Sequence, residues 1–501
     1  MNRALLKALA LSMLLAGAAR ADSGWREIRG PHVVLRTDHG SGNAKEAALA
    51  VERFRAQVIA AAWPRAPFPP ADRVEVTVFS NGLDFERHFA RNVGAVFFHD
   101  VPPFAVLWGT PEKWENRASL ATTETTSILR HELVHHLAAS VYRRQPRWFA
   151  EGLAQFLETV RPGDDGKTVV IGAANLEAMH KYNSFRSIRV ADALAWSSKL
   201  DELPEATQHA LYGVSWLMVH WMFNEHPAQF DQLQGLLSRG IDPDKAWKII
   251  LPGLNTPDID GALNQYVKHG NYNEFAAPYT PPTPPLEERP LTEADVHAEQ
   301  ARVALAAASW SAEPAKHRED AERELAAALK LEPGNVGALL LEARRKSPPE
   351  RAAIARRMTT AHPEDGRGWL LLAQSLPSEP AATAEREAAF KKAIELRPDD
   401  ATPLNDLAWA YTNQGKAAEA APLINKAIQL APYDPSVLDT LAAVQAQLGR
   451  CSEAVATQAR AIDALPEGVS AATRRRLESR LDQYRTHCVS NASASGTGTG
   501  G

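Results

Sequence analysis

The stretch SILRHELVHHLAAS, residues 127–140, contains two histidines four residues apart and a glutamate directly after the first. Residues four apart share one face of an α-helix, so His131 and His135 can present two imidazoles to one metal ion. Glu132 lies about 100° further round the helix, from where its carboxylate can reach a metal-bound water. The pattern therefore predicts a metal-binding helix, and the alternative is a core helix that carries histidines. Apolar residues that would bury either helix are Ile128, Leu129, Leu133, Val134 and Leu137.

A second helix is expected where the chain reads PRWFAEGLAQ, residues 146–155. Proline is favoured at the start of helices, so Pro146 marks where this one opens. Glu151 follows His135 by 16 residues, and Gly152 would allow this helix to pack closely on the first. Two histidines and one carboxylate on two packed helices form the three-ligand set that leaves a fourth zinc position open for water.

These motifs resemble the gluzincin metallopeptidases, in which an HExxH helix is followed by a glutamate ligand on the next helix. The phrase WFAEGLA, residues 148–154, is similar to a group of secreted bacterial gluzincin-like proteins. The resemblance covers roughly residues 30–230 and is sharpest over residues 128–157.

The resemblance implies an α/β (α+β) metallopeptidase domain in which His131, His135 and Glu151 bind one Zn²⁺ ion and Glu132 is the general base. In aminopeptidase-like members a tyrosine further along the chain assists the oxyanion, and Tyr212, 61 residues after Glu151, matches that place. A phenol directed at the developing alkoxide would stabilise it. The alternative is that Tyr212 belongs to the core of an aromatic-rich helix.

Two polar residues beside the motif have supporting roles at most. The side chain of His136 points about 100° away from that of His135, off the metal-binding face, so we interpret it as structural or as a support for a ligand. Gln155, one turn after Glu151, could orient a ligand by a hydrogen bond.

The rest of the amino-terminal half alternates between strand and helix patterns. A helix is expected at 44–62, strands at 32–36 and 73–79, and a hairpin with arms 95–98 and 105–108 bent at Pro102 and Pro103. An edge of this hairpin could hold an extended peptide substrate by sheet addition.

The carboxy-terminal half repeats itself with a period of 34 residues, since residues 401–434 align with residues 435–468. The paired positions are Leu404 and Leu438, Leu407 and Leu441, Ala408 and Ala442, Gly415 and Gly449, Ala420 and Ala454, Ala427 and Ala461, and Pro432 and Pro466. This pattern resembles the tetratricopeptide (TPR) repeat and implies an all-α TPR solenoid. Such an array offers a concave surface for protein partners or acts as a spacer or dimerisation element, and residues 474–487 would cap it.

Proline clusters and small polar residues mark the boundaries. Residues 276–290 contain six prolines, which favour extended geometry and exclude helix or central strand. The expected organisation is a signal peptide at 1–21, a metallopeptidase domain at 22–275, a proline-rich linker at 276–290, TPR repeats with a capping helix at 291–488, and a disordered tail at 489–501.

The first residues predict export. Positive charge at Arg3 and Lys7 precedes an apolar run of about 12 residues, too short for a bilayer that needs about 20, and a small-x-small sequence ends at Ala21. We expect cleavage near Ala21 and a periplasmic or secreted chain with no transmembrane segment; the alternatives are an uncleaved anchor or a buried helix. In an oxidising compartment Cys451 and Cys488 can form a disulfide, or remain two free thiols.

Composition narrows the function. The net charge of −5 on 501 residues gives no basic surface for nucleic acid, and two cysteines exclude a multi-cysteine metal module. The sequence therefore predicts an exported zinc-dependent peptidase whose repeats recruit substrate or partner proteins. One alternative is a cell-envelope TPR adaptor with an inactive or structural metal domain, and another is a zinc hydrolase acting on a non-peptide amide of the cell wall.

Overall fold

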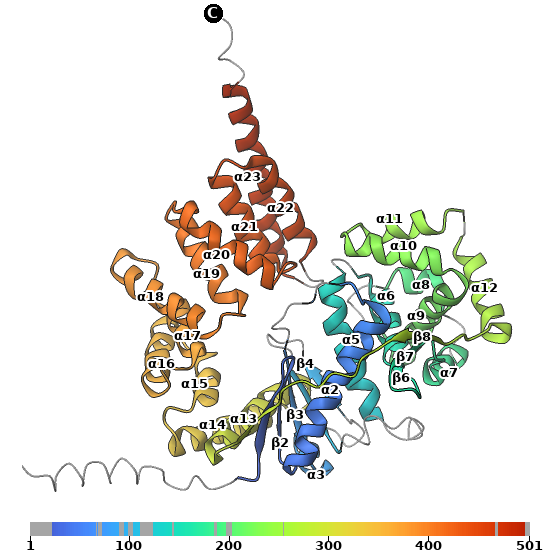
Figure 1. The fold of residues 1–501 in the computed structure, drawn as a ribbon, viewed down its shortest axis with the longest axis horizontal. Helices are drawn as coiled ribbons and strands as arrows, with labels where there is room; N and C mark the ends of the chain where they lie inside the picture. The colour runs from blue at the N-terminus through green and yellow to red at the C-terminus, as the bar shows by residue number, and fades with distance from the viewer. Residues whose placement is uncertain are drawn as a thin grey trace, which may run out of the picture. The chain divides into compact units, whose positions relative to one another are not determined.

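The fold is that of a computed structural model, which describes residues 23–66, 68, 73–89, 95–98, 104–110, 124–142, 145–184, 188–196, 203–253, 255–465 and 469–495. The described chain is mostly helical, with one mixed sheet and one small antiparallel sheet (Figure 1). It divides into two compact units. Unit 1 comprises Met1–Leu49, Val74–Thr125 and Pro285–Ser375, and unit 2 comprises Ala50–Arg73, Thr126–Pro284 and Leu376–Gly501.

The described residues of unit 1 contain a six-stranded mixed sheet. Its strand order is β4 (Ala95–Phe98), β5 (Phe104–Trp108), β3 (Val74–Phe79), β2 (Val33–Thr37), β1 (Arg26–Arg29) and β9 (Glu287–Pro290). Strands β2, β3 and β5 run parallel, whereas β4, β1 and β9 pair antiparallel with their neighbours. The four strands expected from the sequence are confirmed, and the antiparallel β4–β5 pair confirms the two arms of the hairpin; Pro102 and Pro103 lie outside the described residues.

Six helices lie wholly within the described part of unit 1: α3 (Gly82–Glu86), α13 (Glu293–Trp310), α14 (Pro314–Leu331), α15 (Val336–Ala343), α16 (Pro348–Ala361) and α17 (Gly366–Ser375). Helix α13 contributes Val303 and Ala307 to the core that contains Phe79 and Phe104 of the sheet and Trp25, which directly precedes β1. The first helix after the proline-rich segment is therefore part of the sheet's own core.

Charged residues are buried between the sheet and α13. Arg36 on β2 lies 2.7 Å from Glu75 on β3 and 3.0 Å from Glu27 on β1. Glu299 and Arg302 on α13 join the group, because Glu299 accepts a hydrogen bond from Thr77 and Arg302 pairs with Glu75. Buried charges are tolerated only when they are paired, so this network fixes the position of α13 against the strands.

The amino-terminal part of unit 2 is a helical cluster around α9. Helices α6, α7, α8, α10 and α12 all pack on α9. The small sheet has the order β6 (Arg161–Pro162), β7 (Thr168–Ile171) and β8 (Phe275–Pro278). The helix expected at 44–62 is confirmed as α2 (Ser41–Ala62), which belongs to both units. The other helices are α5 (Glu124–Val141), α6 (Arg147–Leu157), α7 (Leu176–Ser184), α8 (Val190–Leu194), α9 (Glu205–Glu225), α10 (Pro227–Ser238), α11 (Pro243–Ile250) and α12 (Thr256–His269).

The remaining helices of unit 2 form antiparallel pairs, as the 34-residue period predicts. Gly415 and Gly449 adopt the same left-handed conformation, with φ of 74° at both, in the turns between paired helices. The alanines at the aligned positions are buried where the helices cross. The helices are α18 (Pro380–Leu396), α19 (Ala401–Asn413), α20 (Ala417–Leu430), α21 (Pro435–Gln447), α22 (Cys451–Asp463) and α23 (Ala471–Ser495).

Helix α23 follows the last repeat, where the sequence predicts a capping helix. Its Leu477 lies in a core cluster with Leu438 of α21 and Ala461 of α22. The helix continues to Ser495, into the segment expected to be a disordered tail from residue 489. Alanine is a strong helix former, and extending an existing helix costs far less than starting one. Residues 496–501 lie outside the described part of the chain.

The proline-rich segment contributes residues to an edge strand of each sheet. Strand β8 pairs with β7, and β9 pairs with β1, each at the edge of its sheet. Edge strands tolerate proline because one side of the strand needs no hydrogen-bond partner. The expectation of a linker at 276–290 omitted these two strands.

Three further expectations concern the ends of the chain and its cysteines. The signal peptide expected at residues 1–21 lies outside the described residues. Cys451, at the start of α22, is disulfide-bonded, and Cys488 is the other cysteine of the sequence. No helix in the described part of the chain has both the length and the apolar character of a bilayer-spanning segment.

Candidate metal centre

His131 and His135 on α5 and Glu151 on α6 converge as the sequence predicts. Glu151 Oε2 lies 3.2 Å from His131 Nε2 and 3.3 Å from His135 Nε2, and the two Nε2 atoms are 3.1 Å apart. One ligand atom from each residue lies within 4.8 Å of the others. Two imidazole nitrogens and one carboxylate oxygen at such separations fit a zinc ion with an open fourth position.

Close packing of α6 positions Glu151. Leu133, Val134 and Leu137 of α5 are buried, as are Phe149 and Leu153 of α6. At Gly152 a Cβ atom would lie 2.3 Å from the backbone oxygen of Ser215 on α9. The sequence assigned Gly152 to close packing against the histidine-bearing helix, but the close approach is to α9.

The electrostatics of the centre follow from its burial and its mixed charges. Burial alone lowers the pKa of His131, but hydrogen bonds to Glu151 and Glu158 outweigh it and raise that pKa well above the usual range. Burial alone raises the pKa of Glu151, and the two histidines reverse this and lower it. The carboxylate is therefore ionised and ready to act as a ligand.

Glu158 holds the other side of His131, and the sequence analysis did not identify it. Glu158 Oε2 lies 2.9 Å from His131 Nδ1, and Asn175 donates a 2.8 Å hydrogen bond to Glu158 Oε1. A carboxylate on the second ring nitrogen fixes the tautomer in which Nε2 is free to bind a metal. Glu158 follows Glu151 by seven residues, two helical turns, and this spacing was the available signal.

Tyr212 lies on α9, the helix that packs on α6. Its ring meets that of Trp196 edge to face, with the ring centres 5.3 Å apart. Burial first, and then the charges of Glu151 and Glu132, raise the pKa of Tyr212 to about 12. The negative charges of these two glutamates therefore favour the protonated phenol, and Glu132 lies on α5 beside the candidate ligand His131.

Gln155 was expected to orient a ligand by a hydrogen bond, but it forms hydrogen bonds with backbone oxygens. Its Nε2 donates to the backbone oxygens of Tyr212, at 3.0 Å, and of Glu151, at 3.3 Å. It therefore joins α6 to α9 and has no hydrogen bond to a ligand side chain among the described contacts. His136 is half-buried on α5, one residue beyond His135.

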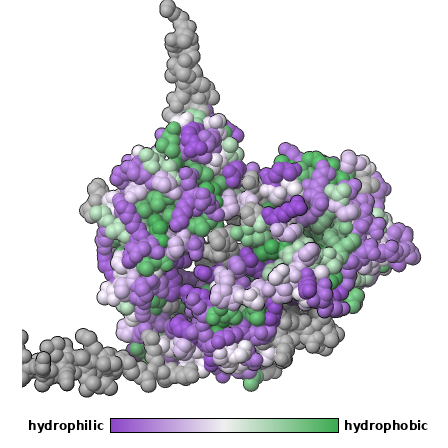
Figure 2. Space-filling view, in the orientation of Figure 1, coloured by the Kyte–Doolittle hydropathy of each residue, from purple (hydrophilic) through white to green (hydrophobic). Residues whose placement is uncertain are grey.

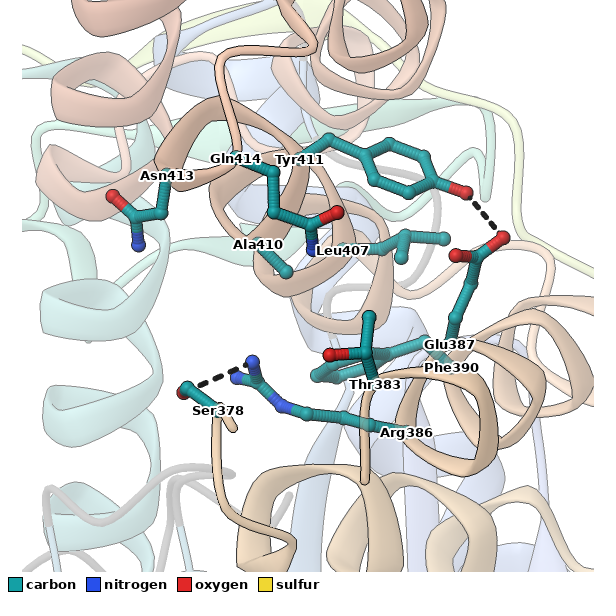
Figure 3. Close-up of a pocket in the computed structure, with 10 residues that line it drawn as sticks. All are labelled: Ser378, Thr383, Arg386, Glu387, Phe390, Leu407, Ala410, Tyr411, Asn413 and Gln414. Carbon is teal, nitrogen blue, oxygen red and sulfur yellow. Dashed lines mark hydrogen bonds between the residues drawn. The ribbon is translucent and has the colours of Figure 1, made fainter. Parts of the chain in front are cut away.

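The repeat helices carry a pocket of about 230 Å³ between α18 and α19. Figure 3 shows Phe390 and Leu407 inside it, with the Tyr411 hydroxyl bonded to Glu387 on one side. On the other side Arg386 bonds to Ser378 at 3.3 Å. On the face in Figure 2, hydrophobic residues are interspersed with hydrophilic ones.

Two family models match parts of the chain. One, described as "Protein of unknown function (DUF1570)", matches residues 125–241, which include all three candidate ligands, Glu132 and Tyr212. The other, described as tetratricopeptide repeat, matches residues 389–421. No curated protein sequence matches the chain.

Solved structures that resemble part of the chain include two with low sequence identity. TTC0263, a thermophilic TPR protein of Thermus thermophilus, is 17% identical with a TM-score of 0.30, covering 38% of this chain and 99% of that one. The MamA protein is 17% identical with a TM-score of 0.26, covering 33% of this chain and 92% of that one. The chain thus combines a segment similar to the DUF1570 family with TPR repeats.

Proposed function

We propose that the protein is an exported zinc-dependent peptidase of the gluzincin type. The observation that carries the proposal is the convergence of His131, His135 and Glu151, with Glu132 next to the first ligand on the same helix. Nδ1 of His131, the ring nitrogen that does not face Glu151, forms a hydrogen bond with Glu158. Metal-binding histidines usually have such a partner on the nitrogen that does not bind the metal.

Bound zinc would supply a Lewis acid that polarises a carbonyl and acidifies a water molecule. Glu132 would accept the proton of the attacking water and return it to the leaving amine. Tyr212 would donate a hydrogen bond to the developing oxyanion, for which its phenol must keep its proton. Glu158 would hold His131 in the orientation and tautomer that binding requires.

The first test is the zinc content of the mature chain, Asp22–Gly501, after extensive dialysis. About one zinc per chain is expected for the wild type and a large loss for Glu151→Ala, because the site has only three protein ligands. A wild type that retains no zinc would contradict the proposal.

The second test separates metal binding from catalysis. Glu132→Gln should keep its zinc and lose cleavage of labelled casein or of a mixed peptide library, because an amide cannot accept the proton. Cleavage at the wild-type rate by this variant would remove Glu132 from the mechanism.

The repeats support a second candidate function. TPR helices are protein-interaction modules, and in a cell-envelope adaptor the metal domain would be inactive or structural. A zinc-loaded protein that cleaves none of these substrates but captures a defined envelope protein would favour the adaptor. If the protein is a peptidase, the surface of the TPR helices would recruit substrate or partner proteins.

Export is the part of the proposal that rests on sequence alone. The charged start, the short apolar run and the cleavage sequence ending at Ala21 support it. Amino-terminal sequencing of the mature protein should begin at Asp22.

A further inference from the structure

Asn175 lies between strand β7 and helix α7, directly before the first residue of α7. Its side-chain Nδ2 donates to Glu158 Oε1 at 2.8 Å and to the backbone oxygen of Gln155 at 3.3 Å. Its Oδ1 accepts a hydrogen bond from the backbone nitrogen of Ala178 at 3.1 Å. Both N–H groups and the carbonyl oxygen of the amide therefore have a partner, and the orientation of the amide is determined.

Of the side chains that commonly cap helices, asparagine alone suits these three partners. A carboxylate could accept from the Ala178 nitrogen, but it has no hydrogen to donate to Glu158 or to the Gln155 oxygen. A serine or threonine hydroxyl has one hydrogen for two acceptors. Capping of α7 needs only an acceptor. The two donated bonds, and not the cap, are what require an amide at position 175.

The orientation of the Glu158 carboxylate depends on the bond from Asn175. Glu158 follows the last residue of α6, and its Oε2 lies 2.9 Å from His131 Nδ1. A glutamate side chain has several rotatable bonds, so holding it in one orientation costs conformational entropy. The contact with His131 holds one carboxylate oxygen, and the bond from Asn175 holds the other. Together they fix the plane of the carboxylate that faces the imidazole.

The segment that carries Asn175 is itself fixed at both ends. At one end, the backbone oxygen of Gly172 accepts a 3.0 Å hydrogen bond from His220 Nε2 on α9. Gly172 has φ of 97°, and a Cβ there would lie 2.5 Å from the backbone oxygen of Asn273. At the other end, the Met179 nitrogen on α7 donates to the Asn175 oxygen at 3.0 Å. The path of the segment is therefore set by α7 and α9.

We propose that Asn175 is a positioning residue of the metal centre. By donating to Glu158 Oε1 it holds the Glu158 carboxylate against Nδ1 of His131, so that Nε2 of the same ring is directed at the metal ion. The inference rests on the proposed zinc-binding function. It gives the segment between β7 and α7 a part in metal affinity, and it makes Asn175 act through Glu158 rather than on the metal or the substrate.

Asn175→Ser separates this role from helix capping. Serine keeps an oxygen that can cap α7 and adds no charge, but it cannot make both donated bonds. Zinc affinity, measured by competition with a chromophoric chelator, should fall several-fold, and urea unfolding checks that the variant is folded. Asn255→Ser is the matched control, because Asn255 Oδ1 caps α12 through the Asp258 nitrogen at 3.0 Å. Its zinc affinity should equal that of the wild type.

An exchange of charge between positions 158 and 175 is the sharper test. Asn175→Asp places two carboxylates against each other, and Glu158→Gln removes the charge beside His131, so each should lower zinc affinity about tenfold. In the double variant the new amide at position 158 can donate to the new carboxylate at position 175 while its oxygen still accepts from His131 Nδ1. The double variant should therefore bind zinc no more weakly than Glu158→Gln alone, whereas independent effects would multiply to about a hundredfold loss.

Three results would overturn the proposal: a zinc affinity of Asn175→Ser equal to that of the wild type, a double variant whose loss is the product of the two single losses, or an equal loss in Asn255→Ser. The last would show that zinc affinity follows helix capping in general. A wild type that binds zinc but cleaves no peptide would overturn the peptidase function alone, and the affinities would still decide the role of Asn175. A wild type that binds no zinc would overturn both.

Discussion

Glu158 Oε2 lies 2.9 Å from Nδ1 of His131, the nitrogen that faces away from Glu151. Loss of such a partner typically costs about 10–100-fold in metal affinity. Glu158→Gln keeps the shape of the side chain and removes its charge, so we expect zinc affinity to fall about tenfold. Competition with a chromophoric chelator measures this directly. Glu177→Gln, an exposed glutamate paired with Lys181 on α7, is the control, and equal affinities in the two variants would exclude the supporting role of Glu158.

The close approach of α6 and α9 predicts an unusual cost for alanine at position 152. A Cβ there would lie 2.3 Å from the Ser215 oxygen and 2.9 Å from Val219 Cγ2, so the helices would have to separate. We expect Gly152→Ala to destabilise the protein by about 2 kcal/mol, in the range for overpacked cores. Urea unfolding followed by circular dichroism gives the value.

Gly261 on α12 provides the matched comparison, because nothing lies within 4 Å of a Cβ at that position. Gly261→Ala should stabilise by roughly 0.5–1 kcal/mol through helix propensity. If both substitutions stabilise alike, the contact between α6 and α9 is looser than described.

His220 on α9 predicts a loss of stability in mild acid. Burial lowers its pKa to about 4, and the ring nitrogens face the Tyr266 hydroxyl at 2.8 Å and the Gly172 oxygen at 3.0 Å. In the unfolded chain the pKa returns to about 6.5, so between pH 6.5 and 4 the unfolded state binds more protons and stability falls as the pH falls. His220→Asn should show a flatter dependence over this window, as measured by unfolding at pH 7 and pH 5. A slope identical to wild type would mean that other groups set it.

The network of charged residues around Glu75 in unit 1 predicts a second loss of stability, at lower pH. Burial alone raises the pKa of Glu75, but Arg36 and Arg302 outweigh it and lower that pKa. The stabilisation is therefore present above the unfolded value of about 4.5 and is lost as the pH falls below it. Glu75→Gln should cost about 3 kcal/mol at pH 7, because two buried arginines lose a charged partner, and should unfold with a weaker pH dependence below 4.5. Glu287→Gln, exposed on β9, should leave both the stability and its acid dependence unchanged.

Periodic features made much of the fold predictable. Strands β2 and β3 follow from their apolar and β-branched residues, and the repeat helices follow from the 34-residue period with Gly415 and Gly449 in equivalent turns. The convergence of His131, His135 and Glu151 was predictable because a metal-binding pattern depends on spacing within and between two helices.

Features that depend on contacts between distant segments were not predictable in this way. Glu299 and Arg302 of α13 look like ordinary helix-surface charges, and only the packing of α13 on β3 shows that they are buried. Glu158 lies just beyond the last residue of α6, where its bond to His131 depends on the path of the whole helix.

Strand β9 and helix α13 also determine how the protein can be cut for experiments. A fragment that stops at residue 290 would keep β9 but lose Leu291, Val303 and Ala307, leaving Trp25 and Phe79 exposed to water. A fragment that begins at residue 291 would carry the buried charges Glu299 and Arg302 without Arg36 and Glu75. Neither half would then be a faithful substitute for the whole, so affinity measurements and cleavage assays both require the undivided mature polypeptide.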